Sequence, residues 1–310
     1  PASANEDDVT FLESYNGEKD EETVARLKEI AAVNPVDPWK IMAITFTNKA
    51  AGELKERLET MLGTNAENIT AATFHSVCVR ILRREIERIG YGHDFAIYDS
   101  DDSLRLLKSC YEALDMSDKI FNPKVVIAAI SQAKDNLLTP ELYAEQTGGD
   151  YYKIGISKLY TAYQKKLVAA NAVDFDDIIC LTVRLFTECG DVLDHYSNRY
   201  RYIMVDEYQD TNYAQLRLVT LLSEKFGNIC VVGDDDQSIY KFRGATIENI
   251  LRFEEQFSGA VVIRLEQNYR STQNILNAAN AVIANNSSRN EKKLWTDIGD
   301  GDKITLFKAI

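Results

Sequence analysis

Histidine, cysteine and proline are scarce in this sequence, and long apolar runs are missing from it. The 310 residues include three histidines, five cysteines and five prolines. The cysteines lack the paired spacing of a zinc motif or a disulfide framework, so we expect reduced thiols in a cytoplasmic protein. No apolar run reaches the roughly 18 residues of a membrane span, and no signal-peptide pattern opens the sequence. We therefore expect no membrane association.

Basic residues are also in the minority. There are 35 lysines and arginines against 48 aspartates and glutamates, which gives a net charge of −13. This balance argues against a nonspecific coat on nucleic acid but leaves room for a local basic track. Arg80, Arg84 and Arg88 would share one face of a helix. That face is either solvated, with Glu85 and Glu87 balancing it, or in contact with phosphates.

Short apolar runs alternate with helical patterns, which predicts an α/β fold with a parallel sheet. The expected strands are Val9–Leu12, Ile41–Thr45, Ile69–Thr73, Tyr202–Val205, Ile229–Val232, Val261–Leu265 and Lys303–Lys308. From about residue 95 to residue 193 the pattern changes to helices, with apolar residues every three or four positions. We expect this stretch to form a helical subdomain inserted into the α/β domain.

Two of the expected strands end in acidic loops. Asp206 and Glu207 follow the strand at Tyr202–Val205, and a run of aspartates follows the strand at Ile229–Val232. In a phosphoryl-transfer site the first acid holds Mg²⁺, and its neighbour orients or deprotonates the attacking water. The alternative is that the acids only cap the end of a strand. The second acidic loop nearby favours the metal–nucleotide interpretation.

The second loop, Gly233–Gly244, carries other chemistry as well. The neutral amide of Gln237 could bind a γ-phosphate or its water, and so sense the state of a nucleotide. Tyr240 and Phe242 alternate with basic residues, of which Arg243 is one. Aromatic faces stack on bases and arginine holds phosphate, so this part of the loop suits single-stranded nucleic acid. The alternative is that both aromatic rings belong to the core.

Similar features recur at the starts of expected helices. Thr45–Ala51 and Thr73–Ser76 both run from a strand through Thr-Phe into a polar helix start. Helix N-termini bind phosphates, and the two phenylalanines can pack against bases or in the core. Further along, Tyr269 could stack on an adenine, and Arg270 could reach a γ-phosphate as an arginine finger.

Together these segments resemble the superfamily 1A DNA helicases of the UvrD/Rep/PcrA type. The segments that carry the resemblance are Ala43–Ala51 (motif Ia), Thr73–Ser76 (Ib), Val205–Asn212 (II), Gly233–Ala245 (III), Gln267–Thr272 (IV) and Val173–Ile178. Their order and spacing agree with that family from about Trp39 onwards.

The resemblance implies a role for each matching residue. Asp206 would bind Mg²⁺, Glu207 would be the catalytic base, and Gln237 would couple the γ-phosphate of ATP to DNA. Tyr269 would stack on the adenine, and Arg270 would be the arginine finger. Contact with DNA is implied for Phe46, Thr73, Phe74, His75, Tyr240, Phe242 and Arg243.

The same resemblance implies a RecA-like (P-loop NTPase) parallel sheet with an inserted helical subdomain. Domain 1A would cover residues 1–94 and 194–265, the helical domain 1B residues 95–193, and the start of domain 2A residues 266–310. The implied activity is ATP-dependent 3′-to-5′ movement on single-stranded DNA and DNA junctions, with ATP and Mg²⁺ as cofactors.

One stretch departs from the family. Where a glycine-rich Walker A loop is expected, the chain has Leu12–Asp20, with Lys19 in place of the P-loop lysine. Side chains at glycine positions obstruct a phosphate cradle, and Glu18 and Asp20 add negative charge beside a triphosphate. The adenine-recognising Q motif and motifs V and VI are also missing.

Three interpretations remain. The chain is an N-terminal fragment of such a helicase, or an inactive single-stranded DNA-binding or regulatory module derived from one, or it binds nucleotide through Lys19 in an atypical loop. We expect little or no unwinding from the chain by itself.

Overall fold

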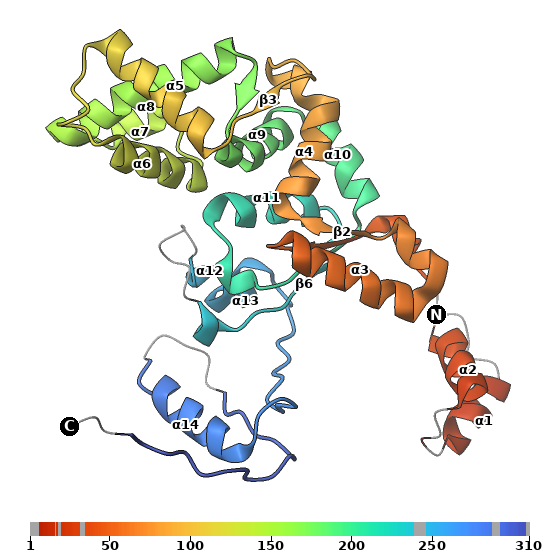
Figure 1. Cartoon of the computed structure of the whole chain (residues 1–310). Helices are drawn as coiled ribbons and strands as arrows, with labels where there is room; N and C mark the ends of the chain where they lie inside the picture. Colours follow the sequence, from red (N-terminus) through yellow and green to blue (C-terminus); the bar gives the residue numbers. More distant parts are fainter. Residues whose placement is uncertain are drawn as a thin grey trace.

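A computed structural model describes residues 6–15, 17, 20–31, 35–238, 246–286 and 292–307. Its centre is a parallel sheet of four strands in the order β2-β1-β5-β6. Figure 1 labels β2 and β6 of this sheet. The strands are β1 (Ile41–Thr45), β2 (Thr70–Thr73), β5 (Tyr202–Val205) and β6 (Ile229–Val231). The α/β class and these four strands are therefore confirmed. Because all four are parallel, their carboxyl ends meet at one edge of the sheet.

Helices cover the sheet and continue into the insertion. Those near the sheet are α3 (Asn48–Leu62), α4 (Phe74–Glu85), α9 (Phe175–Glu188), α10 (Gly190–Arg199) and α11 (Tyr213–Ser223). Two short helices, α12 (Glu248–Leu251) and α13 (Phe253–Gln256), follow the second acidic loop. A core cluster joins the sheet to α4, α9 and α11, with Met42, Phe74 and Leu185 among its buried members.

The insertion has a core of its own, at one end of the molecule in Figure 1. Its helices are α5 (Ser100–Leu114), α6 (Pro123–Asp135), α7 (Pro140–Glu145) and α8 (Tyr151–Ala169), with a small sheet of β3 (Ala96–Ile97) and β4 (Ala172–Val173). Leu107, Ile130 and Leu159 are fully buried between these helices. The helical periodicity in the sequence therefore predicted this region well.

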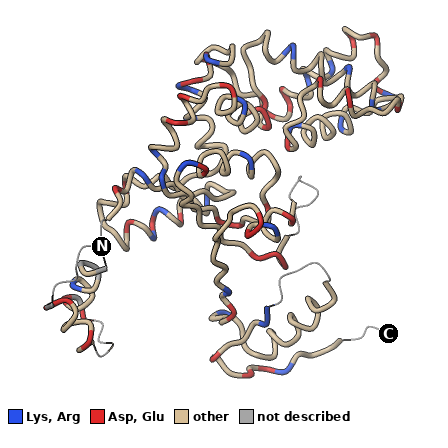
Figure 2. The backbone as a smooth tube through the Cα atoms, turned by 180° about the vertical axis from the view of Figure 1, so that it is seen from behind, with Lys and Arg blue, Asp and Glu red and all other residues tan. Residues whose placement is uncertain are grey.

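The first described segment is helical. The structure has α1 (Glu6–Ser14) and α2 (Glu21–Ala31), both set apart from the sheet in Figures 1 and 2. The strand expected at Val9–Leu12 was wrong. A run of four apolar or small residues cannot by itself distinguish strand from helix, and acids in the first turn favour the helix. Lys19 lies outside the described residues.

The prediction of the last two strands was also wrong for the residues that the structure describes. Residues 261–265 and 303–307 have no regular secondary structure, are exposed, and pair with no strand in the part of the chain that is described. Between them lies α14 (Gln273–Ile283). Extended backbone becomes a strand only where a neighbour satisfies its N–H and C=O groups.

Among the described residues, no helix has the length and apolarity that crossing a bilayer requires.

Candidate functional site

The carboxyl edge of β5 and β6 brings the two acidic loops together, as the sequence predicted. We call residues 206–210 and 233–238 the acidic edge. The Asp206 N–H donates to the Ile44 carbonyl (2.9 Å), and the Val232 N–H donates to the Val205 carbonyl (2.8 Å). These backbone bonds continue the strand pairing by one residue beyond each strand. The side chains of both loops are thereby held at a fixed position on the sheet.

Asp206 and Glu207 project from a sharp turn. The Glu207 N–H donates to Asp206 Oδ1 (3.0 Å). Glu207 itself has φ 52° and ψ 40°, a left-handed conformation that is rare for a residue with a side chain. Such backbone conformations cost about 1–3 kcal/mol and persist where the surrounding structure requires them. The turn therefore fixes the direction in which the Glu207 carboxylate points.

Gln209 joins the two loops. It is buried, and its Oε1 accepts a hydrogen bond from the Asp234 backbone N–H (3.0 Å). Because that N–H can only donate, the amide orientation is fixed, and Nε2 faces Glu207 Oε2 at 2.8 Å. From the sequence we predicted no role for Gln209. Its position two residues after Glu207 was the available signal.

Gly233 makes this contact possible. A Cβ atom at residue 233 would lie 2.5 Å from Gln209 Oε1 and 3.2 Å from the Tyr208 backbone nitrogen. Gly233 does not have a positive φ, so glycine is not needed here for its backbone conformation. It is needed because the two loops approach each other closely at this position.

Gln237 completes a chain of hydrogen bonds. Its Nε2 donates to Asp234 Oδ2 (2.7 Å), so contacts run from Glu207 through Gln209 and Asp234 to Gln237. Burial by itself would raise the pKa of the Asp234 carboxyl. Hydrogen bonds from Lys292 and Gln237 outweigh that effect, and the pKa of Asp234 is lowered. Asp234 is therefore held as a carboxylate in the middle of this chain of contacts.

Asp210 is a second acid close to Glu207. Burial and the negative charge of Glu207 raise the pKa of Asp210. Its Oδ1 atom is buried without a hydrogen-bond partner in the described part of the molecule. An acid with a raised pKa therefore lies beside Glu207 at the acidic edge.

The described residues that were expected to contact DNA differ in how deeply they are buried. Phe74 is 1% exposed and belongs to the core, with the half-buried Phe46 ring at 5.6 Å from it. Thr73 caps α4 by accepting from the Ser76 N–H (3.2 Å). His75 stacks on the exposed Phe175 ring at 3.9 Å, and burial lowers the pKa of His75 to about 4.

Tyr269 and Arg270 lie on the segment that leads into α14. The Tyr269 side chain is 78% exposed, and its hydroxyl donates to Gln267 Oε1 (2.7 Å). Asn268 Oδ1 accepts from the backbone N–H groups of Arg270 and Ser271, which shapes the start of the helix. Three other expected contact residues, Tyr240, Phe242 and Arg243, lie outside the described residues.

One member of the arginine cluster is paired. Arg88 makes two hydrogen bonds of 3.0 Å to the carboxylate of Asp191. Its charge is balanced within the protein, which favours the solvated-face interpretation for this residue.

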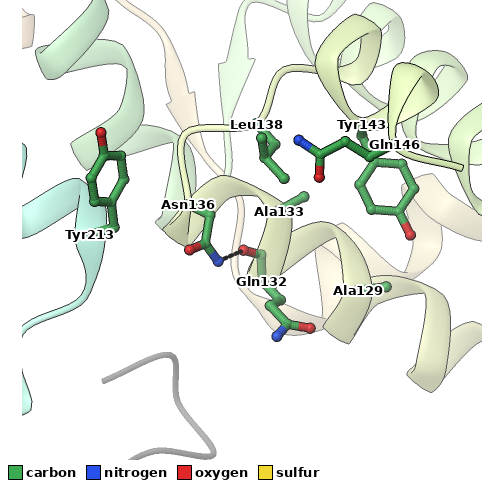
Figure 3. A pocket seen from close by; sticks show the side chains of 8 residues that line it. All are labelled: Ala129, Gln132, Ala133, Asn136, Leu138, Tyr143, Gln146 and Tyr213. Carbon is green, nitrogen blue, oxygen red and sulfur yellow. Dashed lines mark hydrogen bonds between the residues drawn. The ribbon is translucent and has the colours of Figure 1, made fainter. Parts of the chain in front are cut away.

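Two cavities in the described part of the molecule lie away from the acidic edge. One, of about 530 Å³, is lined by α6, α7 and Tyr213 (Figure 3), and another, of about 830 Å³, lies between α7, α8, α9 and α11. None of the hydrogen-bonded residues from Glu207 to Gln237 lines either cavity. The candidate chemistry is thus on an open edge of the sheet.

Comparison with known proteins places this architecture in a family. The family described as "UvrD/REP helicase N-terminal domain" matches residues 23–258, and "UvrD-like helicase C-terminal domain" matches residues 263–310. The ATP-dependent DNA helicase PcrA of Bacillus subtilis is 50% identical over 284 residues, which cover 92% of this chain and 38% of that protein.

PcrA of Staphylococcus aureus is likewise 50% identical, over 89% of this chain and 38% of its own length. The chain therefore spans well under half the length of these relatives. With its parallel sheet, its acidic edge and these matches, the chain belongs to the UvrD/REP helicase family.

Proposed function

We propose that this chain forms part of an ATP-dependent 3′-to-5′ DNA helicase. The observation that carries the proposal is the unbroken set of contacts from Glu207 through Gln209 and Asp234 to Gln237. In it a base for the attacking water and a γ-phosphate sensor are held on one rigid edge of a sheet. An enzyme that ties hydrolysis to movement needs these two groups to respond together.

The residues at the acidic edge fit a magnesium ion. Asp206 lies at the end of β5 with an exposed carboxylate, of which one oxygen accepts a single backbone N–H. Carboxylate oxygens are the ligands that Mg²⁺ prefers, and the ion usually keeps several waters. We propose that Asp206 holds Mg²⁺, which when bound neutralises charge on the phosphates. Glu207 would orient the attacking water and accept its proton.

The described residues before β1 do not form a phosphate-binding loop. The described residues before β1 fold as two helices, α1 and α2, and supply no strand–loop–helix beside the acidic edge. Those residues do not fit the binding of a triphosphate, and we assign them no step in hydrolysis. Lys19 as a nucleotide contact stays a prediction, to be tested by nucleotide binding to Lys19→Ala.

The remaining assignments belong to the same proposal. Residues 1–94 and 194–265 would form domain 1A, residues 95–193 domain 1B, and residues 266–310 the start of domain 2A. Tyr269 would stack on adenine, and Arg270 would reach the γ-phosphate when the domains close. Single-stranded DNA would run over Phe46 and His75 towards Tyr240, Phe242 and Arg243.

Substitution of the base tests this proposal. In a protein that also contains a complete second domain, Glu207→Gln should lower DNA-stimulated ATP hydrolysis by about 10²–10⁴-fold, because loss of a general base has effects of that size. Binding of single-stranded DNA should be unchanged, since Glu207 is not in the expected DNA track. Retention of turnover in the variant would disprove the role of Glu207.

A second candidate function rests on the helical fold of residues 6–14 and 21–31. If no other segment supplies a phosphate cradle, the chain would act as a single-stranded DNA-binding or regulatory module. Fluorescence anisotropy should then show salt-sensitive binding of labelled single-stranded DNA without nucleotide, weakened by Phe242→Ala and by Arg243→Ala. No binding at low salt would rule this function out.

A further inference from the structure

Lys292 reaches the acidic edge from a distant part of the chain. It follows α14 in sequence, and its side chain is 18% exposed. The ammonium group forms an ion pair with Asp234 and lies 3.1 Å from Asp235 Oδ1 and 3.3 Å from Asp236 Oδ2. One lysine thus meets three consecutive carboxylates.

Asp234 is the point where these contacts meet. Its Oδ1 accepts from Lys292 Nζ and from the Asp236 backbone N–H, the latter at 3.0 Å. Its Oδ2 accepts from Gln237 Nε2, while its own N–H donates to Gln209. Any rotation of the Asp234 side chain would therefore change the position of Gln237.

The positive charge of Lys292 is needed to keep this arrangement. One carboxylate oxygen from each of Asp234, Asp235 and Asp236 lies within 4.8 Å of the other two. Like charges at that distance repel, and partial burial strengthens the repulsion. In agreement, hydrogen bonds to Asp234 and Asp235 raise the pKa of Lys292 despite its partial burial. Without the ammonium group, the three carboxylates would move apart.

Hydrogen bonds connect the residues next to Lys292 to the segment that carries Tyr269 and Arg270. The Lys293 N–H donates to Glu266 Oε1 (3.1 Å), the Trp295 N–H to the Glu266 carbonyl (3.1 Å), and the Asn268 N–H to the Trp295 carbonyl (2.7 Å). These bonds attach residues 292–295 to residues 266–268, directly before Tyr269. A shift of that segment relative to the sheet would therefore pull Lys292 with it.

We infer that Lys292 is a positioning residue that transmits the placement of residues 266–268 and 292–295 to Gln237 through Asp234. With Lys292 inserted, Asp234 holds the Gln237 amide; with Lys292 withdrawn, the amide is released. The inference rests on the proposed function only in giving Gln237 the role of phosphate sensor. The linkage itself is a property of the contacts between Lys292, Asp234 and Gln237.

Hydrogen–deuterium exchange of this chain, without nucleotide and with EDTA present, tests the linkage directly. In Lys292→Ala, the amides of residues 234–238 should exchange about tenfold faster, because a hydrogen-bonded turn has lost its anchoring charge. Lys292→Arg keeps the charge and should stay close to the parent. Lys293→Ala is the matched control, since the side chain of Lys293 is exposed. Unchanged exchange in Lys292→Ala, or equal acceleration in Lys293→Ala, would overturn the inference.

Kinetics in a protein with a complete second domain provide the second measurement. Lys292→Ala should lower kcat for DNA-stimulated ATP hydrolysis by about tenfold and change KM for ATP by less than about twofold, because a misplaced group affects the chemical step. Lys292→Arg should recover most of kcat. An unchanged kcat in Lys292→Ala would contradict the role in coupling. If the parent protein shows no hydrolysis, the proposed function fails, while the exchange experiment still decides the linkage.

Discussion

Two clusters in this molecule are built alike, each from one lysine among aspartates, yet their surroundings differ. In the first, Lys134 Nζ lies 2.6 Å from Asp174 Oδ2 and 2.8 Å from Asp177 Oδ1, and its side chain is 2% exposed. The Tyr163 hydroxyl donates to the same Asp174 oxygen (3.0 Å). In the second, Lys292 meets Asp234, Asp235 and Asp236 while partly open to water.

Burial decides what each cluster can do. Around Lys134 the charges cannot separate without leaving an uncompensated ion in the interior, so the cluster ties α6 firmly to the start of α9. Around Lys292 water can replace the lost partner, so separation is inexpensive. The buried cluster thus suits a fixed joint, and the half-buried one suits a contact that opens and closes.

Removing the buried lysine should have the largest effect. Lys134→Met leaves Asp174 and Asp177 buried without their cation, and we expect a loss of about 3–5 kcal/mol in the free energy of unfolding. Chemical denaturation followed by circular dichroism measures the loss.

A variant that removes all three charges is the control for Lys134→Met. In Lys134→Met with Asp174→Asn and Asp177→Asn, the three charges of the cluster are gone, and the amides can still cap α9 through the bonds that join residues 174 and 177. Much of the stability should return. If the triple variant were as unstable as Lys134→Met, the loss would come from packing and the comparison would fail.

Asp135, beside the buried cluster, should make stability depend on pH. Burial and the charge of Asp176 raise the pKa of Asp135 from 3.8 to about 7, although a hydrogen bond from Asn212 opposes this. The folded protein therefore keeps a proton that the unfolded chain releases near pH 3.8. The contribution of Asp135 to the free energy of unfolding is fully present below pH 3.8. It declines as the pH rises towards 7 and stays low above pH 7.

Asp135→Asn removes this titration with little change in shape. At pH 8 the variant should be about 1–2 kcal/mol more stable than the parent, less than the full shift implies because the site is partly screened. At pH 5 the two proteins should have nearly equal unfolding midpoints. A stability difference that does not vary with pH would show that Asp135 is ionised in the folded protein.

Opening the half-buried cluster should have the smallest effect on stability. Lys292→Met should lower the free energy of unfolding by about 1 kcal/mol or less, and added salt should reduce the difference further. The same salt series on Lys134→Met should change little, because buried charges are weakly screened. A loss for Lys292→Met as large as that for Lys134→Met would erase the distinction between a fixed joint and an opening contact.

Much of the fold could be predicted from the sequence where the pattern was long or repeated. The helices at Ser100–Leu114 and Pro123–Asp135 follow from apolar residues at spacings of three and four, with Asp99 and Asn122 capping them. The strands at Ile41–Thr45 and Tyr202–Val205 follow from compact apolar runs.

The secondary structure of short apolar runs at the periphery could not be predicted correctly from the sequence. Residues 9–12, 261–265 and 303–307 have apolar patterns typical of strands, but a strand exists only when another strand pairs with it. In the described part of the chain they find no such partner. The first run is helical, and the other two have no regular secondary structure.

Part of the candidate site could likewise be predicted from the sequence, and part could not. By itself, the sequence determined that Asp206, Glu207, Asp234 and Gln237 would stand at strand ends, because loops that follow parallel strands emerge at one edge. Only the tertiary structure decided that Gln209 links them and that Lys292, 58 residues beyond Asp234, inserts between the aspartates. The physical reason is the separation along the sequence between the residues that interact. Strand and helix patterns depend on neighbours a few residues apart, whereas a hydrogen bond between distant residues depends on how whole elements pack.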